Sequence, residues 1–493
     1  MHAICSYQLT THQLNNPFRK MCGIIGIKGN DEVAKELFVG LLALQHRGQN
    51  AAGISTYDGE RFYYKKDTGL VSRVLSEEYL RRLHGSIGIG HVRYPTIGSG
   101  GEEDAQPFLI NSPVGMAMVH NGNIVNYFEL RRTLEKRRYL NSFCDVEVLL
   151  NIFAENFDKD PFKATEKIMD ITNGGYSVIA IVSGLGLFAF RDPNAIRPFI
   201  FGRRGENYIF ASESVVLQIL DYKVIKDLEP GEGILIDENG KVTQRIIKKG
   251  APRHCIFEYI YFARPESFLD GLSVYQKRLN LGKELSKETQ RQGVKPDVVV
   301  PIPDTSRPTA IALAEELDVP YREGLIKNRY ILRTFIMSTD EERAMYIKYK
   351  LNPLVSELRG KKVLLVDDSI VRGTTSRQIV RVVRNAGAKE IYFAISAPPI
   401  RNPCYYGIDM QTRSELIARE KSVEEIREVL KADALIYQTL DGLTRAIGKE
   451  SFCRACFDGD YPTKIKGKEM LEIEEKRKKV TRKKTAGDDL FDV

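Results

Sequence analysis

Two stretches of the chain combine residue types that could do chemistry. Cys22 opens an apolar run in MCGIIGI, where its thiol could act as a nucleophile. Asp367 and Asp368 end another apolar run, in VLLVDDSIVRGTTS, and small and hydroxyl residues follow them. Two carboxylates beside such a loop suit a polyol phosphate or a metal ion. We therefore expect two separate sites with different chemistry.

A lone cysteine at the start of a strand is more often a small buried hydrophobe than a nucleophile. Four further segments change that weighting: LQHRGQNAAGIS (residues 44–55), GHVRYPT (90–96), HNGN (120–123) and CDVE (144–147). Together and in this order they resemble the class II glutamine amidotransferases, whose nucleophile is an N-terminal cysteine. The resemblance extends from Cys22 to about residue 249.

This resemblance implies a role for each of five residues. Cys22 attacks the glutamine amide with its own α-amine as the base, whose ordinary pKa of about 7.7–8.0 suits neutral pH. The side chain of Asn121 and the backbone N–H of Gly122 stabilise the oxyanion. Arg93 binds the α-carboxylate of glutamine, and Asp145 binds its α-ammonium. For each residue taken alone, a surface arginine, an Asn-Gly turn or a helix-capping aspartate is the commoner interpretation. Because all of them occur together in the family's order, the functional roles are favoured.

The α-amine mechanism also places a demand on residues 1–21. A peptide bond at Cys22 turns the amine into an amide, which cannot accept a proton. Residues 1–21 are therefore expected to be a propeptide that is removed, or Met21 is the true start. A methionine directly before the nucleophile favours the second. The remaining alternative is an extension that stays attached and leaves the glutaminase inactive.

The acid pair Asp367–Asp368 predicts a binding loop at the end of a buried strand. The carboxylates can bind ribose hydroxyls, while loop N–H groups and a helix N-terminus can hold a phosphate. Open parallel sheets bind ligands in the crevice beyond the carboxyl ends of their strands. The alternative is a capped turn in which Asp and Ser only form the turn. Two adjacent carboxylates make little sense there unless a polyol or a metal lies between them.

The segment resembles the signature that binds phosphoribosyl pyrophosphate (PRPP) in type I phosphoribosyltransferases. The resemblance implies that Asp367 and Asp368 bind the ribose and, with Ser306 of PIPDTS, form a Mg²⁺ site, which suits a few oxygen ligands plus substrate phosphates. A basic segment from Lys327 to about residue 352 resembles the mobile loop that closes over pyrophosphate in that family, with Lys350 as a second contact. The other implied PRPP-binding residues are Ser369, Arg372, Gly373, Thr374 and Thr375.

Four of the seven cysteines lie late in the chain, at Cys255, Cys404, Cys453 and Cys456, and the last two form a C-x-x-C pair. Such a pair alone could be redox-active, zinc-binding or merely buried. The two signatures together resemble the amidophosphoribosyltransferases, one branch of which carries a [4Fe–4S] cluster with ligands in these sequence contexts. The resemblance implies a structural cluster, because the net reaction moves no electrons; zinc in the same four sites is the main alternative.

The elements that must position these residues fall into two domains. Residues 22–250 contain short β-rich runs separated by Gly, Asn and Asp turns, with helices expected near residues 32–44 and 146–155. This pattern predicts an α+β domain, and the resemblance specifies an N-terminal nucleophile (Ntn) hydrolase αββα sandwich. Residues 251–463 alternate strands and helices, which predicts an α/β type I phosphoribosyltransferase domain with a parallel sheet. Residues 464–493 are expected to be a charged tail.

Composition sets limits on the class of protein. The chain has 493 residues, 43% of them hydrophobic and 28% charged, as in a globular protein of two domains. No apolar run is long enough for a membrane span, and the first twenty residues contain no continuous apolar segment like that of a signal peptide. A cytoplasmic protein with reduced cysteines is therefore predicted. Ten Lys and Arg lie between Lys464 and Lys484 in the tail, against four Glu, so much of the net charge of +8 is concentrated in this stretch. Without interleaved aromatic residues, that tail does not predict nucleic-acid binding.

Joined in this order, the two signatures resemble the amidophosphoribosyltransferase family. The resemblance implies that glutamine, PRPP and water give phosphoribosylamine, glutamate and pyrophosphate, the committed step of purine synthesis. It also implies a homo-oligomer with purine nucleotides as feedback inhibitors. One alternative is another glutamine amidotransferase, such as a sugar-phosphate aminating enzyme, against which the PRPP signature argues. The other is a non-catalytic PRPP-sensing regulator, against which the retained glutaminase residues argue.

Overall fold

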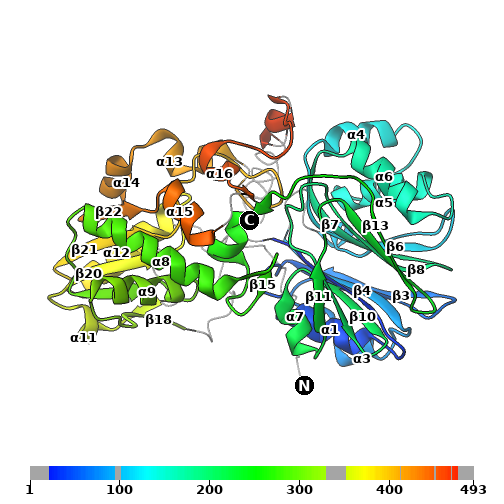
Figure 1. Ribbon diagram of the computed structural model, residues 1–493, viewed down its shortest axis with the longest axis horizontal. Coiled ribbons are helices and arrows are strands. Elements are labelled where there is room, and N and C mark those ends of the chain that lie inside the picture. The colour runs from blue at the N-terminus through cyan, green and yellow to red at the C-terminus, as the bar shows by residue number, and fades with distance from the viewer. Residues whose placement is uncertain are drawn as a thin grey trace, which may run out of the picture.

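The computed structural model describes residues 21–94, 101–328, 351–410, 412–448, 451–467, 469–472 and 474–475. The chain forms two lobes that meet along a waist, and each lobe has its own sheets and helices (Figure 1). Strands β1 to β13 build the first lobe, and the four-stranded parallel sheet lies in the second. The predicted boundary at 250/251 falls between β13 and β14, and it stays a prediction.

Two stacked antiparallel sheets form the first lobe. Their strand orders are β11-β9-β10-β1-β4-β2-β3 and β13-β12-β8-β7-β6-β5. The strands are β1 (Gly23–Lys28), β2 (Ala51–Tyr57), β3 (Phe62–Thr68), β4 (Ile87–Arg93), β5 (Phe108–Ile110), β6 (Met116–Ile124), β7 (Gly174–Val182), β8 (Gly186–Arg191), β9 (Ile200–Arg204), β10 (Asn207–Ala211), β11 (Lys223–Asp227), β12 (Glu232–Asp237) and β13 (Val242–Ile246).

Helices cover both outer faces of this pair of sheets, with α1 and α7 on one side and α4, α5 and α6 on the other (Figure 1). They are α1 (Ala34–Ala43), α2 (Val71–Val74), α3 (Glu77–Leu80), α4 (Tyr127–Leu134), α5 (Asp145–Glu155), α6 (Pro161–Ile171) and α7 (Ser214–Ile219), with a short 3₁₀ turn η1 (Glu102–Asp104).

Strand β1 shows why the layers stack in this way. All six of its residues are buried, because successive side chains point to opposite covered faces. Ile25 contacts the α1 side, where a Cβ on Gly40 would lie 2.3 Å from its Cδ1 atom. Gly26 faces the second sheet, where its own Cβ would lie 2.8 Å from Ile179 of β7. The predicted αββα sandwich is confirmed.

A parallel sheet in the order β17-β20-β21-β22 forms the centre of the second lobe. Its strands are β17 (Val298–Pro301), β20 (Lys362–Asp367), β21 (Glu390–Ile395) and β22 (Ala434–Tyr437). Leu285 of α8 (Val274–Arg291) and Leu313 of α9 (Arg307–Leu317) pack against one face of the sheet. Ile379 of α12 (Thr374–Asn385) and Ile426 of α14 (Val423–Leu430) belong to the core on the other face. Helices on both faces explain the continuous apolar strands, and the predicted α/β domain is confirmed.

Short elements complete the second lobe and the waist. Strand β14 (His254–Cys255) pairs in parallel with β23 (Phe452–Cys453), so residues from the start and the end of this lobe lie side by side. The remaining elements are η2 (Glu258–Phe262, a π-helix), β15 (Phe268–Leu269), β16 (Leu272–Ser273), β18 (Leu325–Lys327), β19 (Leu351–Pro353), α11 (Val355–Leu358), η3 (Arg413–Glu415), α13 (Ile417–Glu420), α15 (Leu440–Ile447) and α16 (Ala455–Asp458).

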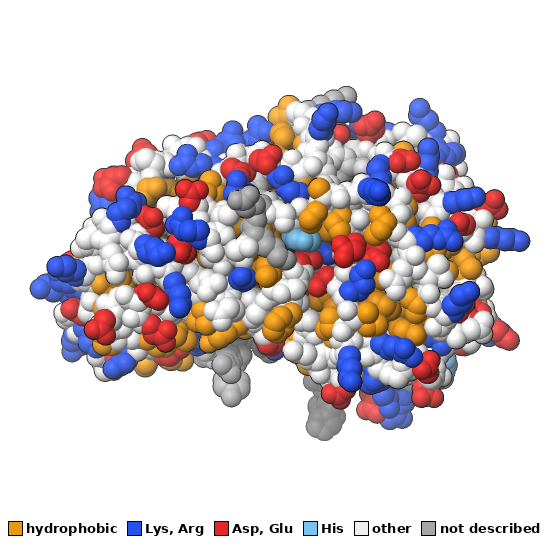
Figure 2. Space-filling view, viewed as in Figure 1, with side chains coloured by type: hydrophobic (Ala, Val, Ile, Leu, Met, Phe, Trp, Pro, Cys, Tyr) orange, Lys and Arg blue, Asp and Glu red, His pale blue; other side chains and the backbone are white. Residues whose placement is uncertain are grey.

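Acidic and basic side chains are intermixed over the face of the molecule in Figure 2, and hydrophobic side chains gather mainly at the waist and on the lower part of the first lobe. The face therefore carries no broad patch of one charge. Among the described residues, no helix has the length and apolar character needed to cross a membrane.

Candidate active sites

Cys22 lies directly before β1, in the interior of the first lobe. Its side chain is 8% exposed, and its thiol donates to the carbonyl of Tyr94 at 3.6 Å. In the described part of the chain this is the only hydrogen bond of the thiol. Burial raises the pKa of the Cys22 thiol, against the opposing effects of the Tyr94 contact and the nearby Arg93 charge. The thiol is therefore protonated at neutral pH and needs a base when it attacks.

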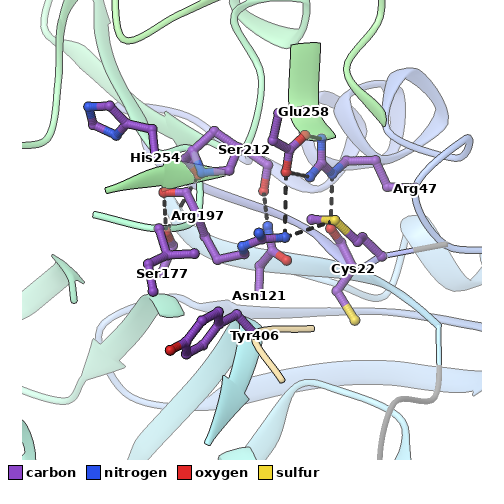
Figure 3. A network of polar contacts seen from close by, with 12 residues as sticks. Cys22, Arg47, Asn121, Ser177, Arg197, Ser212, His254, Glu258 and Tyr406 are labelled. Carbon is purple, nitrogen blue, oxygen red and sulfur yellow. Dashed lines mark hydrogen bonds and ion pairs between the residues drawn. The ribbon is translucent and has the colours of Figure 1, made fainter. Parts of the chain in front are cut away.

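The predicted oxyanion residues lie on β6, beside the nucleophile. The Asn121 amide donates to Ser212 Oγ at 3.2 Å, and Ser212 Oγ also accepts the backbone N–H of Ile24 at 3.0 Å, two residues from Cys22 (Figure 3). Gly122 has a φ of +150°, and a Cβ on it would lie 2.0 Å from the carbonyl oxygen of Gly175. Only glycine fits this position, because any side chain would collide with the backbone of β7.

The two predicted glutamine-binding residues are also buried in this lobe. Arg93 ends β4 and lies 3.5 Å from Asp104, and the charges of Cys22 and Asp145 both act on it. Asp145 is the first residue of α5, and it accepts the N–H of Ile124 at 3.2 Å and approaches His120 Nδ1 at 3.5 Å. A cation and a carboxylate thus lie near the nucleophile from two different elements. The roles assigned to them stay predictions.

A segment of the second lobe, residues 404–410, covers the glutaminase residues. Asn123 donates its side-chain amide to the carbonyl of Tyr405 at 2.8 Å, and the Tyr94 hydroxyl donates to Asp409 at 2.6 Å. Gly407 packs so closely that its Cβ would lie 3.1 Å from Gly122. The candidate oxyanion site is therefore in contact with the other domain.

The acid pair of the second lobe lies where the sequence predicts it, at the carboxyl end of β20. Asp367 ends the strand, the N–H of Asp368 donates to the Asp367 carboxylate at 2.9 Å, and the Ser369 hydroxyl donates to the Asp368 carboxylate. Gly373, with a φ of +76°, caps the N-terminus of α12, whose first residues are Thr374 and Thr375. The strand, loop and helix N-terminus form an arrangement that can hold a phosphate.

Ser306 and Lys327 approach the same edge of the sheet from neighbouring segments. Ser306 lies in the loop after β17, the strand that pairs with β20, and its hydroxyl is buried with no hydrogen-bond partner among the described residues. Lys327 ends β18 and bonds Asp304 at 2.7 Å. Strands β18 and β19 pair with each other across residues 329–350. Lys350 and most of the predicted mobile loop lie outside the described residues.

The four late cysteines are all buried and none is in a disulfide. Cys255 and Cys453 are paired residues of β14 and β23. The carbonyl of Cys456 accepts the N–H groups of Arg401 and Asn402, both at 3.0 Å, close in sequence to Cys404. Within the described residues, no group of three or more His, Cys, Asp and Glu side chains lies close enough to hold a single metal ion.

Sequence reasoning missed the buried ion pairs beside Cys22. Arg47 lies inside the LQHRGQNAAGIS segment but was given no role, and it donates to the Cys22 carbonyl at 2.9 Å. Its partners Glu213 and Glu258 come from distant parts of the chain. The sequence did offer one signal for Arg47, its position within the segment LQHRGQNAAGIS, which resembles the glutamine amidotransferases. The sequence contains no pattern that would indicate Glu213 and Glu258 as its partners.

Comparison with known families covers both lobes. Residues 91–218 match a glutamine amidotransferase domain, and residues 272–425 match a phosphoribosyl transferase domain. The first match contains the Arg93, Asn121 and Asp145 positions, and the second contains the Asp367–Asp368 pair.

Similar proteins match over nearly the whole chain. An amidophosphoribosyltransferase of Pseudomonas aeruginosa is 46% identical, over 94% of this chain and 98% of that protein. An Escherichia coli protein of the same name is 47% identical, over 90% of this chain and 93% of its own length. A solved structure of glutamine PRPP amidotransferase from B. subtilis, complexed with ADP and GMP, superposes with a TM-score of 0.85 at 39% identity, covering 90% of this chain and 98% of that one.

Proposed function

The chain belongs to the amidophosphoribosyltransferase family, and from this membership we propose how its own residues divide the reaction between the two lobes. The enzyme moves the amide nitrogen of glutamine to C1 of PRPP, the committed step of purine synthesis. This membership excludes the sugar-phosphate aminating alternative and the non-catalytic regulator. The observation that supports the division most is the contact of segment 404–410 with Gly122, which brings the second lobe directly against the candidate oxyanion site of the first.

In the first lobe, Cys22 is the nucleophile. Its sulfur attacks the amide carbon of glutamine while the thiol proton passes to the free α-amine of the same residue, because the raised pKa of the thiol leaves it protonated. The Asn121 side chain and the Gly122 N–H stabilise the oxyanion. Ammonia then leaves with the transferred proton, and water hydrolyses the thioester to glutamate. Arg93 and Asp145 hold the α-carboxylate and α-ammonium of glutamine.

In the second lobe, Asp367 and Asp368 bind the ribose hydroxyls of PRPP. The Arg372–Gly373 backbone, Thr374 and Thr375 bind the 5′-phosphate at the N-terminus of α12, and Ser369 belongs to the same PRPP-binding loop. Ammonia attacks C1 of the ribose, the bond to pyrophosphate breaks, and pyrophosphate leaves. Lys327 contacts the pyrophosphate, and the same contact is assigned to Lys350, which lies outside the described residues.

A Mg²⁺ ion fits the same edge of the sheet. Oxygen ligands, the type that Mg²⁺ prefers, come from the carboxylates of Asp367 and Asp368 and from the buried hydroxyl of Ser306, which has no hydrogen-bond partner among the described residues. Since Mg²⁺ keeps several waters and substrate phosphates as ligands, these few protein groups suffice. When bound, the ion would neutralise charge on the departing pyrophosphate.

We also propose that Cys255, Cys404, Cys453 and Cys456 hold a [4Fe–4S] cluster, as in the iron–sulfur branch of the family. Each thiolate in such a cluster binds its own iron, whereas zinc needs all four ligands on one ion. Cys255 and Cys453 are paired residues of neighbouring strands, and the segment just before Cys404 hydrogen-bonds to the carbonyl of Cys456, which supports one shared site for the four thiols.

The surroundings of the four thiols support this proposal. Burial raises the pKa of Cys255 to about 11, so the thiol is inert unless a metal displaces its proton. Arg197 is fully buried, its charge interacts with Cys255 and Cys404, and its Nε and Nη2 atoms have no hydrogen-bond partner among the described residues. A cluster with sulfide acceptors would supply partners for these donors.

Metal analysis tests the cluster. Natively purified protein is expected to contain about four iron and four acid-labile sulfide per chain, with a brown visible absorbance that is lost in oxygen. Cys453→Ser should lower the iron content, whereas Cys144→Ser, a buried cysteine of the other lobe, should leave it unchanged. Stoichiometric zinc without sulfide would contradict the proposal.

Removal of residues 1–21 is expected, because the base is the α-amine of Cys22. Intact-mass measurement of natively expressed protein should show a chain that begins at Cys22. Protein that retains residues 1–21 should form phosphoribosylamine from ammonia but not from glutamine. A fully active glutaminase that still carries residues 1–21 would overturn the assignment of the base.

Regulation and assembly are proposed on the family resemblance. The related B. subtilis structure was solved with ADP and GMP, which supports purine nucleotides as feedback ligands of this chain. We also propose a homo-oligomer and a cytoplasmic location. Nucleotide inhibition curves and sedimentation of the purified enzyme would test the first two.

A further inference from the structure

Arg47 holds the main chain of the proposed nucleophile. It lies in the turn after α1, its side chain is fully buried, and its Nε donates to the Cys22 carbonyl at 2.9 Å (Figure 3). A guanidinium is planar, so its other nitrogens must be held in place if Nε is to keep this direction. The orientation of the Cys22 main chain therefore depends on the groups that bind Nη1 and Nη2, on the side of the guanidinium away from Cys22.

Two carboxylates from different lobes bind the far side of Arg47. Its Nη1 donates to Glu213 at 2.6 Å and to Glu258 at 3.1 Å, and its Nη2 donates to Glu258 at 2.8 Å. Glu258 thus grips the guanidinium with both carboxylate oxygens, the geometry that fixes an arginine most firmly. Figure 3 shows Arg47 between Glu258 and Cys22.

Glu213 already has other partners. Its carboxylate contacts His46 at 2.7 Å and accepts the N–H of Arg264 and the hydroxyl of Ser267, both at 2.9 Å. Burial opposes its charge, but His46 and Arg47 outweigh burial and lower the pKa of Glu213 below its usual value. Among the described residues, the Glu258 carboxylate hydrogen-bonds to Arg47 alone, and it lies 3.7 Å from Arg197. The contacts of Glu258 therefore indicate that it mainly orients Arg47, whereas Glu213 also binds other groups.

The backbone that carries Glu258 is fixed by the phosphoribosyl lobe. Glu258 is the first residue of the π-helix η2, a rare geometry that is frequently found at functional sites. Arg278 of α8 donates to the carbonyls of Tyr259 at 2.9 Å, Tyr261 at 3.0 Å and Ala263 at 2.8 Å. Burial lowers the pKa of Arg278 to about 10, and the charge of Asp368 in the PRPP loop acts in the opposite direction.

We propose that Glu258 is a positioning residue for glutamine hydrolysis: a carboxylate of the phosphoribosyl lobe orients Arg47 and, through it, the Cys22 main chain. The inference rests on the proposed role of Cys22. Glu258 touches neither substrate, so its loss should slow the attack without weakening glutamine binding. A misplacement of the nucleophile on the order of 1 Å costs about a hundredfold in rate.

The variant Glu258→Gln tests the proposal, because it keeps the shape of the side chain and removes its charge. The kcat for glutamine hydrolysis should fall about tenfold to a hundredfold, while KM for glutamine changes less than about twofold. Phosphoribosylamine formation from ammonia should stay at the parent level, which also reports correct folding. The matched control is Glu266→Gln, a half-exposed partner of Arg264 in the same segment, which should leave both activities unchanged.

A double-variant cycle separates positioning from general stability. If Glu258 acts through Arg47, then Glu258→Gln should have little further effect on kcat in an Arg47→Lys background. An unchanged kcat in Glu258→Gln, an equal loss of ammonia-dependent activity, or multiplying effects in the double variant would each overturn the proposal. If Glu258→Gln is insoluble, Glu258→Asp, which keeps the charge but shortens the side chain by one methylene, tests the grip on Arg47 with the same two activities as readouts. Residual glutaminase in Cys22→Ala would instead refute the proposed nucleophile.

Discussion

Cys22→Ala is expected to abolish glutamine-dependent phosphoribosylamine formation while leaving ammonia-dependent formation within about twofold of the parent. Loss of a covalent nucleophile costs at least about 10⁴-fold, because the remaining oxyanion donors cannot replace the thioester route. The second lobe does not contain Cys22, so PRPP and ammonia should still react there. Both activities are measured as pyrophosphate release in the same preparation.

The ammonia reaction is the internal control for folding in that experiment. Glutamate release should be lost in parallel with glutamine-dependent synthesis, since both need the thioester. Glutamine-dependent turnover above about 1% of the parent value would show that another group attacks the amide. A loss of ammonia-dependent activity as well would show that the two lobes do not function separately in the way proposed.

Asp367→Ala combined with Asp368→Ala is expected to abolish phosphoribosylamine formation from both glutamine and ammonia. The two carboxylates hold the ribose and supply Mg²⁺ ligands, so their joint loss should cost at least about 10³-fold. Basal glutamine hydrolysis should persist, because Cys22 lies in the other lobe. Stimulation of that hydrolysis by PRPP should disappear.

Asp297→Asn is the matched control for the acid pair. Asp297 lies just before β17, at the amino-terminal end of the strands and so away from the acid pair at their carboxyl end. Its carboxylate accepts the N–H of Lys362 at 2.7 Å. Its replacement should leave phosphoribosylamine formation intact. If PRPP still stimulated glutamine hydrolysis in the Asp367 and Asp368 double variant, the PRPP site would have to lie elsewhere.

Much of the fold can be predicted from local pattern. The apolar runs before Asp367 and after residue 297 are β20 and β17, because a strand buried on both faces needs a continuous hydrophobic sequence. Helix α12 follows from the spacing of Ile379 and Val383, which are both buried. Helix α1 is two residues shorter at its start than the predicted span 32–44.

The contacts between the lobes could not be predicted in this way. Tyr94 and Asp409 are 315 positions apart, and Arg47 and Glu258 are 211 apart. Periodicity reports which face of an element is buried but not which distant segment buries it. The π-helix at Glu258 could not be predicted either, but for a local reason. Its sequence EYIYF has the aromatic and β-branched residues that are typical of a strand.

The resemblance to known families identified the candidate site residues, whereas only the structure shows which residues surround them. The HNGN segment indicates Asn121 and Gly122, but the closeness of Gly175 to Gly122 explains why glycine is required there. The Asp367–Asp368 pair is recognisable in the sequence because a binding loop of this kind is local. The position of Ser306 next to this acid pair depends on the pairing of β17 with β20, which joins segments that are distant in the sequence.

The most direct test of the central claim follows the amide nitrogen of glutamine. The enzyme is supplied with glutamine labelled with ¹⁵N in the amide, PRPP and Mg²⁺, and glutamate, pyrophosphate and labelled phosphoribosylamine are measured together. Two coupled sites predict equal amounts of all three, with the label on the ribosyl product. Glutamate formed without pyrophosphate, or a product without the label, would contradict the transfer of nitrogen from Cys22 in one lobe to PRPP in the other.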